Sequence, residues 1–160
     1  MEVDYGSKLL ISNLEIGNGA KVLDVGCGYG PIGLAIAASD PQSVVTMVDI
    51  NERAVELAQN NAKMNGISNV RILQSDLLEA VRMEAFDVIV SNPPIRAGKE
   101  TVHSIFSQAR DCLSSGGSLW IVIQKKQGAP SAYAKLEELY GEVTEVCKDK
   151  GYRILQAKKQ

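Results

Sequence analysis

The stretch KVLDVGCGYGPIG, residues 21–33, decides the fold of this 160-residue chain. Its first five residues, KVLDV, form an apolar run typical of a buried strand. Gly26, Gly28 and Gly30 then allow the backbone to turn tightly and a ligand to approach closely, and Pro31 suits the first position of a helix. A strand, a glycine loop and a helix N-terminus in this order predict a cradle for a nucleotide or dinucleotide.

Two acidic residues indicate which ligand the cradle holds. Asp49 ends the apolar run VVTMVD about 20 residues after the GxGxxG string of residues 28–33, where a ribose-binding carboxylate belongs. Asp24 ends the first strand, and there it would repel a pyrophosphate by like charge. This position suits a ligand with an ammonium or sulfonium group instead. S-adenosylmethionine carries both groups, together with a ribose and an adenine.

A second motif, Asn92-Pro93-Pro94, follows the apolar run FDVIVS of residues 86–91, which is typical of a buried strand. Each proline fixes φ and removes a backbone donor, so the groups left pointing outward are an amide side chain and unpaired carbonyls. Two such acceptors can hold a planar NH2 group by its hydrogens, which turns the nitrogen lone pair toward an electrophile. Alone, the motif would be interpreted as a turn. After the fourth strand of this arrangement, it predicts chemistry at a nitrogen.

The strings DVGCGYG, VDI, SDLL and SNPPI, in this order and spacing, resemble the class I S-adenosylmethionine-dependent methyltransferases. The chain most resembles the family of small-subunit ribosomal RNA guanine-N2 methyltransferases and their short single-domain relatives. Three further strings, VDYGSKLL, RAGK and QKKQGAPS, also look like that short group. The resemblance runs from Val3 to Leu155, and it implies methyl transfer to a nitrogen without naming which one.

The resemblance implies roles for the residues that follow the strands. Asp49 would take the two ribose hydroxyls, Ile50 would lie against the adenine, and Asp76 would accept from the adenine amino group beside the Leu77 backbone. The alternative for Asp76 is to cap a short following helix, and the alternative for Asp24 is to cap its own loop. Asn92 would also contact the cofactor. The loop residues that would hold its methionine part are Asp24, Gly26, Cys27, Gly28 and Gly30; we expect Cys27 to act as a small filler there, not as a nucleophile.

The expected catalytic group is Asn92, Pro93 and Pro94. The Asn92 oxygen and the Pro93 carbonyl would each accept from one hydrogen of an exocyclic amine, so the contribution is orientation and electrostatics. Adenine-N6 and glutamine-N5 enzymes usually place an aromatic residue where this chain has Ile95, which favours guanine in ribosomal RNA. The alternatives are a protein glutamine or small-molecule amine methyltransferase, a non-catalytic cofactor-binding module, and an NAD-dependent oxidoreductase.

The pattern of apolar runs predicts an α/β fold: a Rossmann-like doubly wound sheet of seven strands, mostly parallel with an antiparallel last strand, and helices on both faces. We expect Ser7 to cap a helix over residues 8–14 and Asn51 to cap the helix that carries Ala54 and Ala58. The remaining strands are expected at residues 70–74 and 118–124 and in a hairpin around residues 149–151. Two helical faces are also expected: Ala54, Leu57, Ala58 and Ala62 on one helix, and Val102, Ile105, Phe106, Ala109, Cys112 and Leu113 on another.

Basic side chains cluster after the later strands, although the net charge of −2 gives no global attraction for phosphates. They are expected to form a rim that contacts RNA phosphates around the site, with solvated surface lysine as the alternative. Together with Ile95, the rim comprises Arg96, Lys99, Lys125, Lys126, Lys148 and Lys150.

Composition supports one globular domain over residues 1–160. No apolar run of the sequence approaches a membrane span of about 20 residues, and we expect no signal peptide. Its three cysteines lack metal-ligand spacing, so we expect no metal site, reduced thiols and a cytoplasmic protein. Larger relatives carry an additional N-terminal domain, so the N-terminal helix region 1–16 could be truncated, and a homodimer partner could then supply part of the site.

Overall fold

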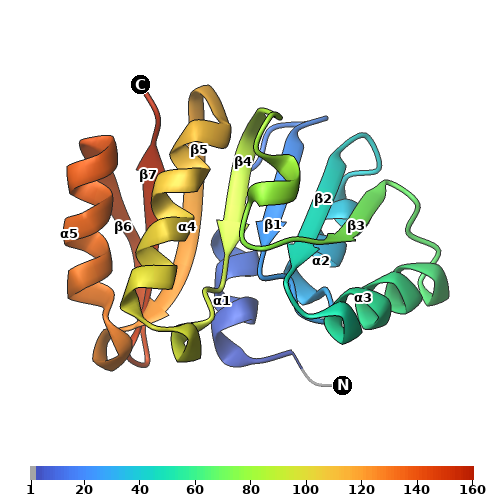
Figure 1. Cartoon of the computed structure of the whole chain (residues 1–160), viewed down its shortest axis with the longest axis horizontal. Coiled ribbons are helices and arrows are strands. Elements are labelled where there is room, and N and C mark those ends of the chain that lie inside the picture. Colours follow the sequence, from blue (N-terminus) through green and yellow to red (C-terminus); the bar gives the residue numbers. More distant parts are fainter. Residues whose placement is uncertain (1–2) are drawn as a thin grey trace.

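One seven-stranded sheet forms the centre of the structure, a computed structural model that describes residues 3–160 (Figure 1). The strand order is β3-β2-β1-β4-β5-β7-β6; the first five of these strands run parallel, and β7 is antiparallel to both of its neighbours. This is the predicted sheet. The strands are β1 (Lys21–Val25), β2 (Val44–Asp49), β3 (Val70–Gln74), β4 (Phe86–Ser91), β5 (Leu113–Gln124), β6 (Glu142–Asp149) and β7 (Tyr152–Lys158).

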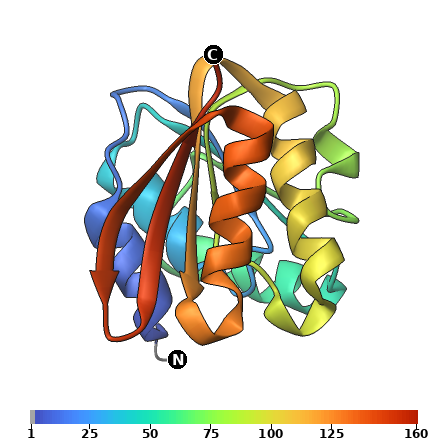
Figure 2. The same cartoon turned by 90° about the vertical axis from the view of Figure 1, so that its left-hand side faces the viewer.

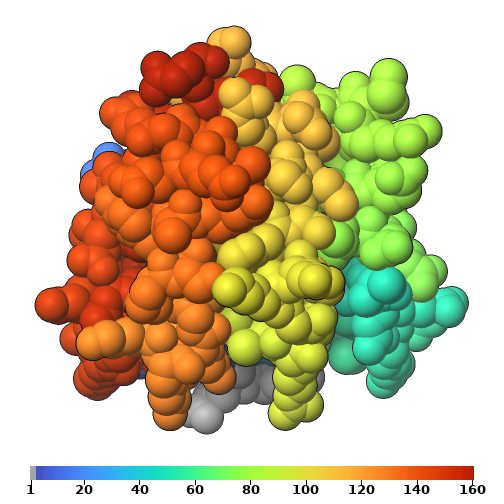
Figure 3. Space-filling view, turned by 60° about the vertical axis from the view of Figure 1, so that its left-hand side comes forward, coloured from blue at the N-terminus to red at the C-terminus, as the bar shows by residue number. Residues whose placement is uncertain are grey.

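Helices cover both faces of the sheet (Figure 2). On one face α4 and α5 lie side by side (Figure 3, yellow and orange). On the other face α1 and α2 pack, and α3 adds Ala58 and Ala62 to the same core cluster. The α-helices are α1 (Tyr5–Asn13), α2 (Pro31–Ser39), α3 (Glu52–Met64), α4 (Lys99–Cys112) and α5 (Ala129–Tyr140); three 3₁₀ turns are η1 (Glu79–Val81), η2 (Ile95–Ala97) and η3 (Lys125–Gln127).

The central strands read as continuous apolar runs because both of their faces are buried. Along β5, Leu119 and Ile121 join the core cluster beneath α4 and α5, whereas Trp120 and Val122 join the cluster beneath α1 and α2. Successive side chains of a strand point to opposite faces, so one strand supplies both cores. The sheet is thereby fixed between two helical layers, with its strand ends left free for function.

Two local predictions were wrong. Asp4, not Ser7, caps α1: its side chain accepts from the Ser7 backbone amide at 2.9 Å, because that amide occupies the third helical position that a cap satisfies. On α3 the predicted residues do face the protein, with Ala58 and Ala62 buried and Ala54 and Leu57 half-buried, and Val55 is buried as well. The first two residues of the predicted region 1–16 lie outside the described residues.

The second error concerns the start of β5. Leu113 was expected on the helix and the strand over residues 118–124, but β5 begins at Leu113. Leu113 pairs with Phe86 of β4, and a register shift follows before Ser118 pairs with Val88. The extra residues of this bulge interrupt the alternation of inward and outward side chains on which strand prediction rests. The first part of β5 is therefore not recognisable from the sequence.

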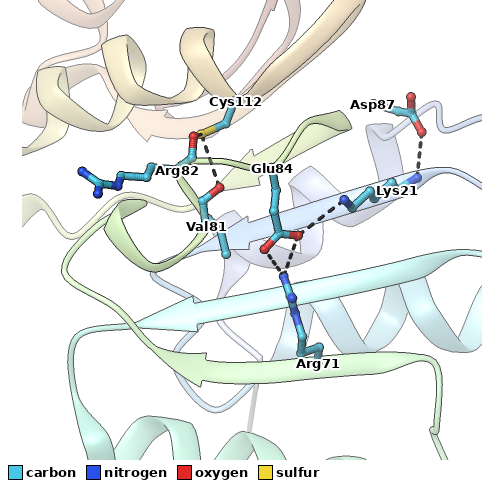
Figure 4. A network of polar contacts seen from close by, with 7 residues as sticks. All are labelled: Lys21, Arg71, Val81, Arg82, Glu84, Asp87 and Cys112. Atoms are coloured by element: carbon cyan, nitrogen blue, oxygen red, sulfur yellow. Dashed lines mark hydrogen bonds and ion pairs between the residues drawn. The ribbon is translucent and has the colours of Figure 1, made fainter.

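A polar network fixes the edge of the sheet that lies away from the strand carboxyl ends (Figure 4). The Glu84 carboxylate accepts two hydrogen bonds from Arg71 Nη2, at 2.8 and 2.7 Å, and lies 3.4 Å from Lys21 Nζ. Partial burial raises the pKa of Glu84, but the two cations outweigh burial and lower it. The segment before β4 is thereby tied to β1 and β3.

Among residues 3–160, no helix combines the length and the apolar composition that crossing a membrane requires.

Gly33 provides a test of the packing between α2 and β2. A Cβ atom on Gly33 would lie 2.7 Å from both Cγ and Sδ of buried Met47. Alanine normally stabilises a helix relative to glycine by about 1 kcal/mol. Here we expect Gly33→Ala to lower the free energy of unfolding by about 1–3 kcal/mol, because the core is overpacked. Urea denaturation measures this change.

The matched control is the same substitution on a Met47→Ala background. Removing the thioether side chain opens the space that the new methyl group needs, so the cost of Gly33→Ala should vanish there. A stabilising Gly33→Ala in the otherwise native chain would contradict this account of the contact.

Candidate functional site

The pairing of β1 with β4 brings the glycine loop beside the Asn-Pro-Pro motif. Val25 pairs with Ser91, and Ser91 Oγ donates a hydrogen bond to the Val25 carbonyl at 2.8 Å. Beyond this pair the segments that follow β1 and β4 stay close, since a Cβ atom on Gly26 would lie 3.8 Å from Pro94 Cδ. Two motifs about 65 residues apart therefore meet at the carboxyl ends of the parallel strands, where ligands bind in such sheets.

A pocket of about 310 Å³ opens at this edge. The carboxyl ends of β1, β2 and β3 form one wall, and η2 with the first turns of α4 forms the other. Six other predicted site residues do not line it: residue 24 lies on β1, and residues 27, 28, 30, 92 and 93 lie on the loops that follow β1 and β4. The predicted site residues that do line it are Gly26, Asp49, Ile50, Asp76, Leu77 and Pro94.

Backbone amides hold the Asp49 carboxylate in place. Its Oδ2 accepts from the Gly28 amide at 2.9 Å, and its Oδ1 accepts from the Asn51 amide at 2.9 Å. Each carboxylate oxygen can accept a second hydrogen bond. The pair of oxygens is thus oriented at the pocket wall and retains the capacity to accept from two vicinal hydroxyls.

Asp24 is 1% exposed and only half satisfied. Its Oδ2 accepts from the Gly33 amide in the first turn of α2 at 2.9 Å, and not from its own loop. Its Oδ1 has no partner among the described residues. Burial raises the pKa of Asp24 to about 7, the Gly33 hydrogen bond opposes this, and the charge of Asp49 adds to it. An orphaned buried carboxylate oxygen calls for an explanation, and a cationic ligand would supply one.

The residues after β3 also bear on the pocket. Asp76 does not cap η1 through its side chain, because the N-cap position is Leu78 and no side-chain bond is made there. Leu77 has a φ of 52°, a left-handed conformation that is costly for a residue with a branched side chain. Strained backbone of this kind gathers at ligand sites.

Cys27 is 5% exposed, and burial raises the pKa of its thiol. Such a thiol is a poor nucleophile, which agrees with its expected role as a filler. Gly30 begins α2 with a φ of 103°, and a Cβ atom there would lie 2.9 Å from the Leu34 side chain. The loop therefore needs glycine at position 30 on conformational grounds as well as for packing.

Asn92 is oriented by α1, which sequence reasoning missed. Its Nδ2 donates to Ser7 Oγ at 3.1 Å and lies 3.4 Å from Asp4 Oδ1. Neither the Asn92 oxygen nor the Pro93 carbonyl accepts a hydrogen bond from a described residue. The string VDYGSKLL pointed to this region through its resemblance to the short relatives, but it gave no contact between residues 85 positions apart.

Charge divides this edge of the sheet into two halves. Asp24, Asp49 and Asp76 end or follow β1, β2 and β3, which lie on one side of the β1–β4 seam. The predicted basic residues follow β4 and β5 or flank the β6–β7 turn on the other side, and all of them are exposed. Three of them, Lys125, Lys126 and Lys150, line a hollow of about 590 Å³.

The remaining predicted residue, Ile95, faces away from the pocket of Asp49. It lines a second pocket of about 200 Å³ between α4 and α5, together with Lys99 and His103. The His103 ring stacks on Phe106 with centroids 5.7 Å apart. Burial lowers the pKa of His103, and the charges of Lys99 and Lys135 lower it further. Within residues 3–160, no group of three or more His, Cys, Asp or Glu side chains could hold a metal ion.

Two known proteins are similar to this chain over nearly its whole length. Protein YbxB of Bacillus subtilis, which is uncharacterized, is 56% identical over 162 residues; the match covers 99% of this chain and 80% of that protein. The ribosomal RNA large subunit methyltransferase G of Aeromonas salmonicida is 32% identical over 165 residues and 99% of this chain. The match spans 43% of that enzyme, so this chain corresponds to less than half of its length.

A solved structure also aligns with nearly the whole chain. It is the 16S rRNA N2 G1207 methyltransferase of T. thermophilus in complex with AdoMet and guanosine, with a TM-score of 0.88 and 30% identity. The alignment covers 99% of this chain and 44% of that one. The family described as the methyltransferase small domain matches residues 1–156. Because this match takes in nearly the whole chain, the chain belongs to the methyltransferase small domain family.

Proposed function

We propose that this protein transfers a methyl group from S-adenosylmethionine to the exocyclic amino group of a guanine in ribosomal RNA. The observation that carries the proposal is the position of Asn92. It lies at the seam between the acidic and the basic halves of the strand edge, with its amide nitrogen already engaged by α1. The likeness to the guanine-N2 enzyme of T. thermophilus supports the choice of target.

The acidic half fits the cofactor. The orphaned Oδ1 of Asp24 would accept from the ammonium group of the methionine part, beside the backbone of Gly26, Cys27, Gly28 and Gly30. Asp49, with both oxygens oriented by amides, would take the ribose hydroxyls. When bound, S-adenosylmethionine supplies a methyl group activated by its sulfonium. The residues that would hold its adenine are Ile50, Asp76 and Leu77, which line the pocket.

The Asn92-Pro93-Pro94 motif would hold the acceptor. With its nitrogen engaged, Asn92 offers its oxygen, and the Pro93 carbonyl is the second acceptor. Each would accept from one hydrogen of the amine, which fixes the nitrogen and directs its lone pair. Catalysis then consists of orientation in a site of fixed dipoles.

The basic half fits a polyanionic substrate. Exposed lysines and one arginine follow β4 and β5 and flank the hairpin turn, whereas the three acids end or follow β1, β2 and β3. Phosphate contacts of this kind supply most of the affinity of nucleic-acid complexes, whereas base specificity comes from the site itself. The residues of this rim are Ile95, Arg96, Lys99, Lys125, Lys126, Lys148 and Lys150.

Substituting Asn92 tests the amine clamp. We expect Asn92→Ala to lower the rate of methyl transfer about a hundredfold or more, the usual loss when one preorganised hydrogen-bonding group is removed. Affinity for S-adenosylhomocysteine, measured by calorimetry, should stay within about twofold, because the cofactor pocket is lined mainly by other residues. The matched control is Asn60→Ala on the exposed face of α3, which should change neither quantity. Full activity of Asn92→Ala would refute the clamp.

The substrate class has its own test. Ribosomal RNA transcripts made in vitro carry no methyl groups, so we expect labelled methyl to enter them and to appear as N2-methylguanosine after digestion to nucleosides. Transfer should weaken steeply with added salt, because the rim acts through phosphates. Label that enters only protein, or only a small amine, would reject the RNA proposal while leaving methyl transfer in place.

The raised pKa of Asp24 predicts two effects of pH. The carboxyl has an ordinary pKa of 3.8 and a folded pKa of about 7, so the folded state binds the extra proton between these values. The free energy of unfolding should therefore fall as pH rises from about 4 to about 7, by about 4 kcal/mol from this group. Asp24→Asn removes this contribution, and urea denaturation at several pH values measures the difference from the native chain.

Binding should show the opposite trend. An ammonium group beside Asp24 favours the ionised carboxyl, so affinity for S-adenosylhomocysteine should rise with pH through about 7 in the native chain. In Asp24→Asn the affinity should be weaker and independent of pH over this range. Equal pH profiles for the two proteins would show that Asp24 does not meet the cationic group.

A further inference from the structure

We infer that Asp4 and Ser7, in the first turn of α1, are positioning residues that set which end of the Asn92 amide faces the substrate. The inference rests on the proposed function, because it assigns a purpose to the orientation of Asn92. It concerns a part of the molecule that lies outside the cofactor pocket and outside the basic rim.

Two contacts join the N-terminus of α1 to Asn92, and a third joins the two residues that make them. Asn92 Nδ2 donates to Ser7 Oγ at 3.1 Å, and its distance to Asp4 Oδ1 is 3.4 Å. Ser7 Oγ in turn donates to Asp4 Oδ2 at 3.1 Å. Ser7 is 2% exposed, so its hydroxyl has no access to bulk water as an alternative partner.

The direction of these hydrogen bonds is what selects the amide orientation. A carboxylate can only accept, so Asp4 draws the hydroxyl hydrogen of Ser7 toward itself. Ser7 then presents lone pairs to Asn92, and Asp4 Oδ1 presents more. Only the NH2 end of the amide can satisfy them, since a flipped amide would place its oxygen against acceptors. The Asn92 oxygen is therefore directed away from α1.

The first turn of α1 is itself held rigidly. The Tyr5 hydroxyl donates to the Asp149 carboxylate, and the Tyr5 and Tyr152 rings lie 5.5 Å apart. A Cβ atom on Gly6 would lie 2.9 Å from the Tyr152 ring, so the helix approaches β7 as closely as a glycine allows. Lys150 Nζ lies 4.8 Å from the Tyr5 ring centroid. The turn that orients Asn92 is thus braced against the β6–β7 hairpin.

The capping role of Asp4 can be separated from its positioning role. Asp4 also accepts from the Ser7 backbone amide, which stabilises the start of α1. Asp4→Ser keeps a good capping residue but is too short to reach the Ser7 hydroxyl and Asn92 as well. Ser7→Ala keeps Asp4 and the cap but removes the hydroxyl. Ser12→Ala is the control: Ser12 lies on the exposed side of the same helix and bonds only to the Leu9 carbonyl among described residues, apart from Asn13.

The first measurement is of the Asn92 side-chain amide itself. In a ¹⁵N-labelled full chain, the two Nδ2 proton signals are identified by their absence in Asn92→Ala. We expect Ser7→Ala and Asp4→Ser to shift both signals and to speed their exchange with water, while Ser12→Ala leaves them unchanged. Unchanged signals in Ser7→Ala would overturn the inference. This readout needs no methyl acceptor, so it holds whatever the substrate is.

The second measurement is of methyl transfer to unmethylated ribosomal RNA transcripts. We expect Ser7→Ala and Asp4→Ser to lower kcat between about tenfold and about a hundredfold, the scale of a misplaced reacting group, with the KM for S-adenosylmethionine unchanged. Thermal unfolding of each variant checks that the fold persists. If Asn92→Ala is inactive but Ser7→Ala transfers at the native rate, the positioning inference fails alone. If Asn92→Ala is fully active, the proposed amine clamp fails.

Discussion

The pairing of β1 with β4 is the constraint on which the site depends. These strands are adjacent in the sheet although two other strands and two helices separate them in the sequence. Their last paired residues, Val25 and Ser91, are locked together by a side-chain hydrogen bond as well as by the ladder. Because both strands are buried on two faces, a slip of one residue would exchange the side chains packed in the two cores and is disfavoured. The register of the sheet therefore sets the distance between the glycine loop and the Asn-Pro-Pro motif.

The seam between these two strands also separates charges of opposite sign. Carboxylates gather at the ends of the strands on one side, and ammonium and guanidinium groups gather on the other. A cationic donor and a polyanionic acceptor would each be attracted to the matching half and repelled from the other. Local arrangement, and not the net charge of −2, is what favours the two ligands. Asn92 lies at the seam itself and carries no charge. Its amide could therefore orient an amine through hydrogen bonds without holding it by an ionic attraction.

The sequence predicted the sheet well and the site in part. The runs KVLDV, VVTMVD and FDVIVS are buried strands because periodicity and burial agree there. The start of β5 could not be predicted, because its bulge removes the alternation. Gly26, Asp49 and Asp76 line one pocket because parallel strands end at one edge, and their roles toward a cofactor stay predictions. The support of Asn92 by Ser7 was missed because the contact joins residues 85 positions apart and depends on the docking of a whole helix.

The docking of α1 has a consequence for the order in which the molecule assembles. This helix packs on α2, β5 and β7, and the last two of these partners are made more than 100 residues later than the helix itself. Contacts of such long sequence separation form late, because the chain between them must be closed at a cost in entropy. While the chain emerges from the ribosome, α1 has only α2 to pack on until β5 and the β6–β7 hairpin follow. The glycine loop can thus take shape early, whereas the contacts that hold α1 against the far strands form only after β7 has been made.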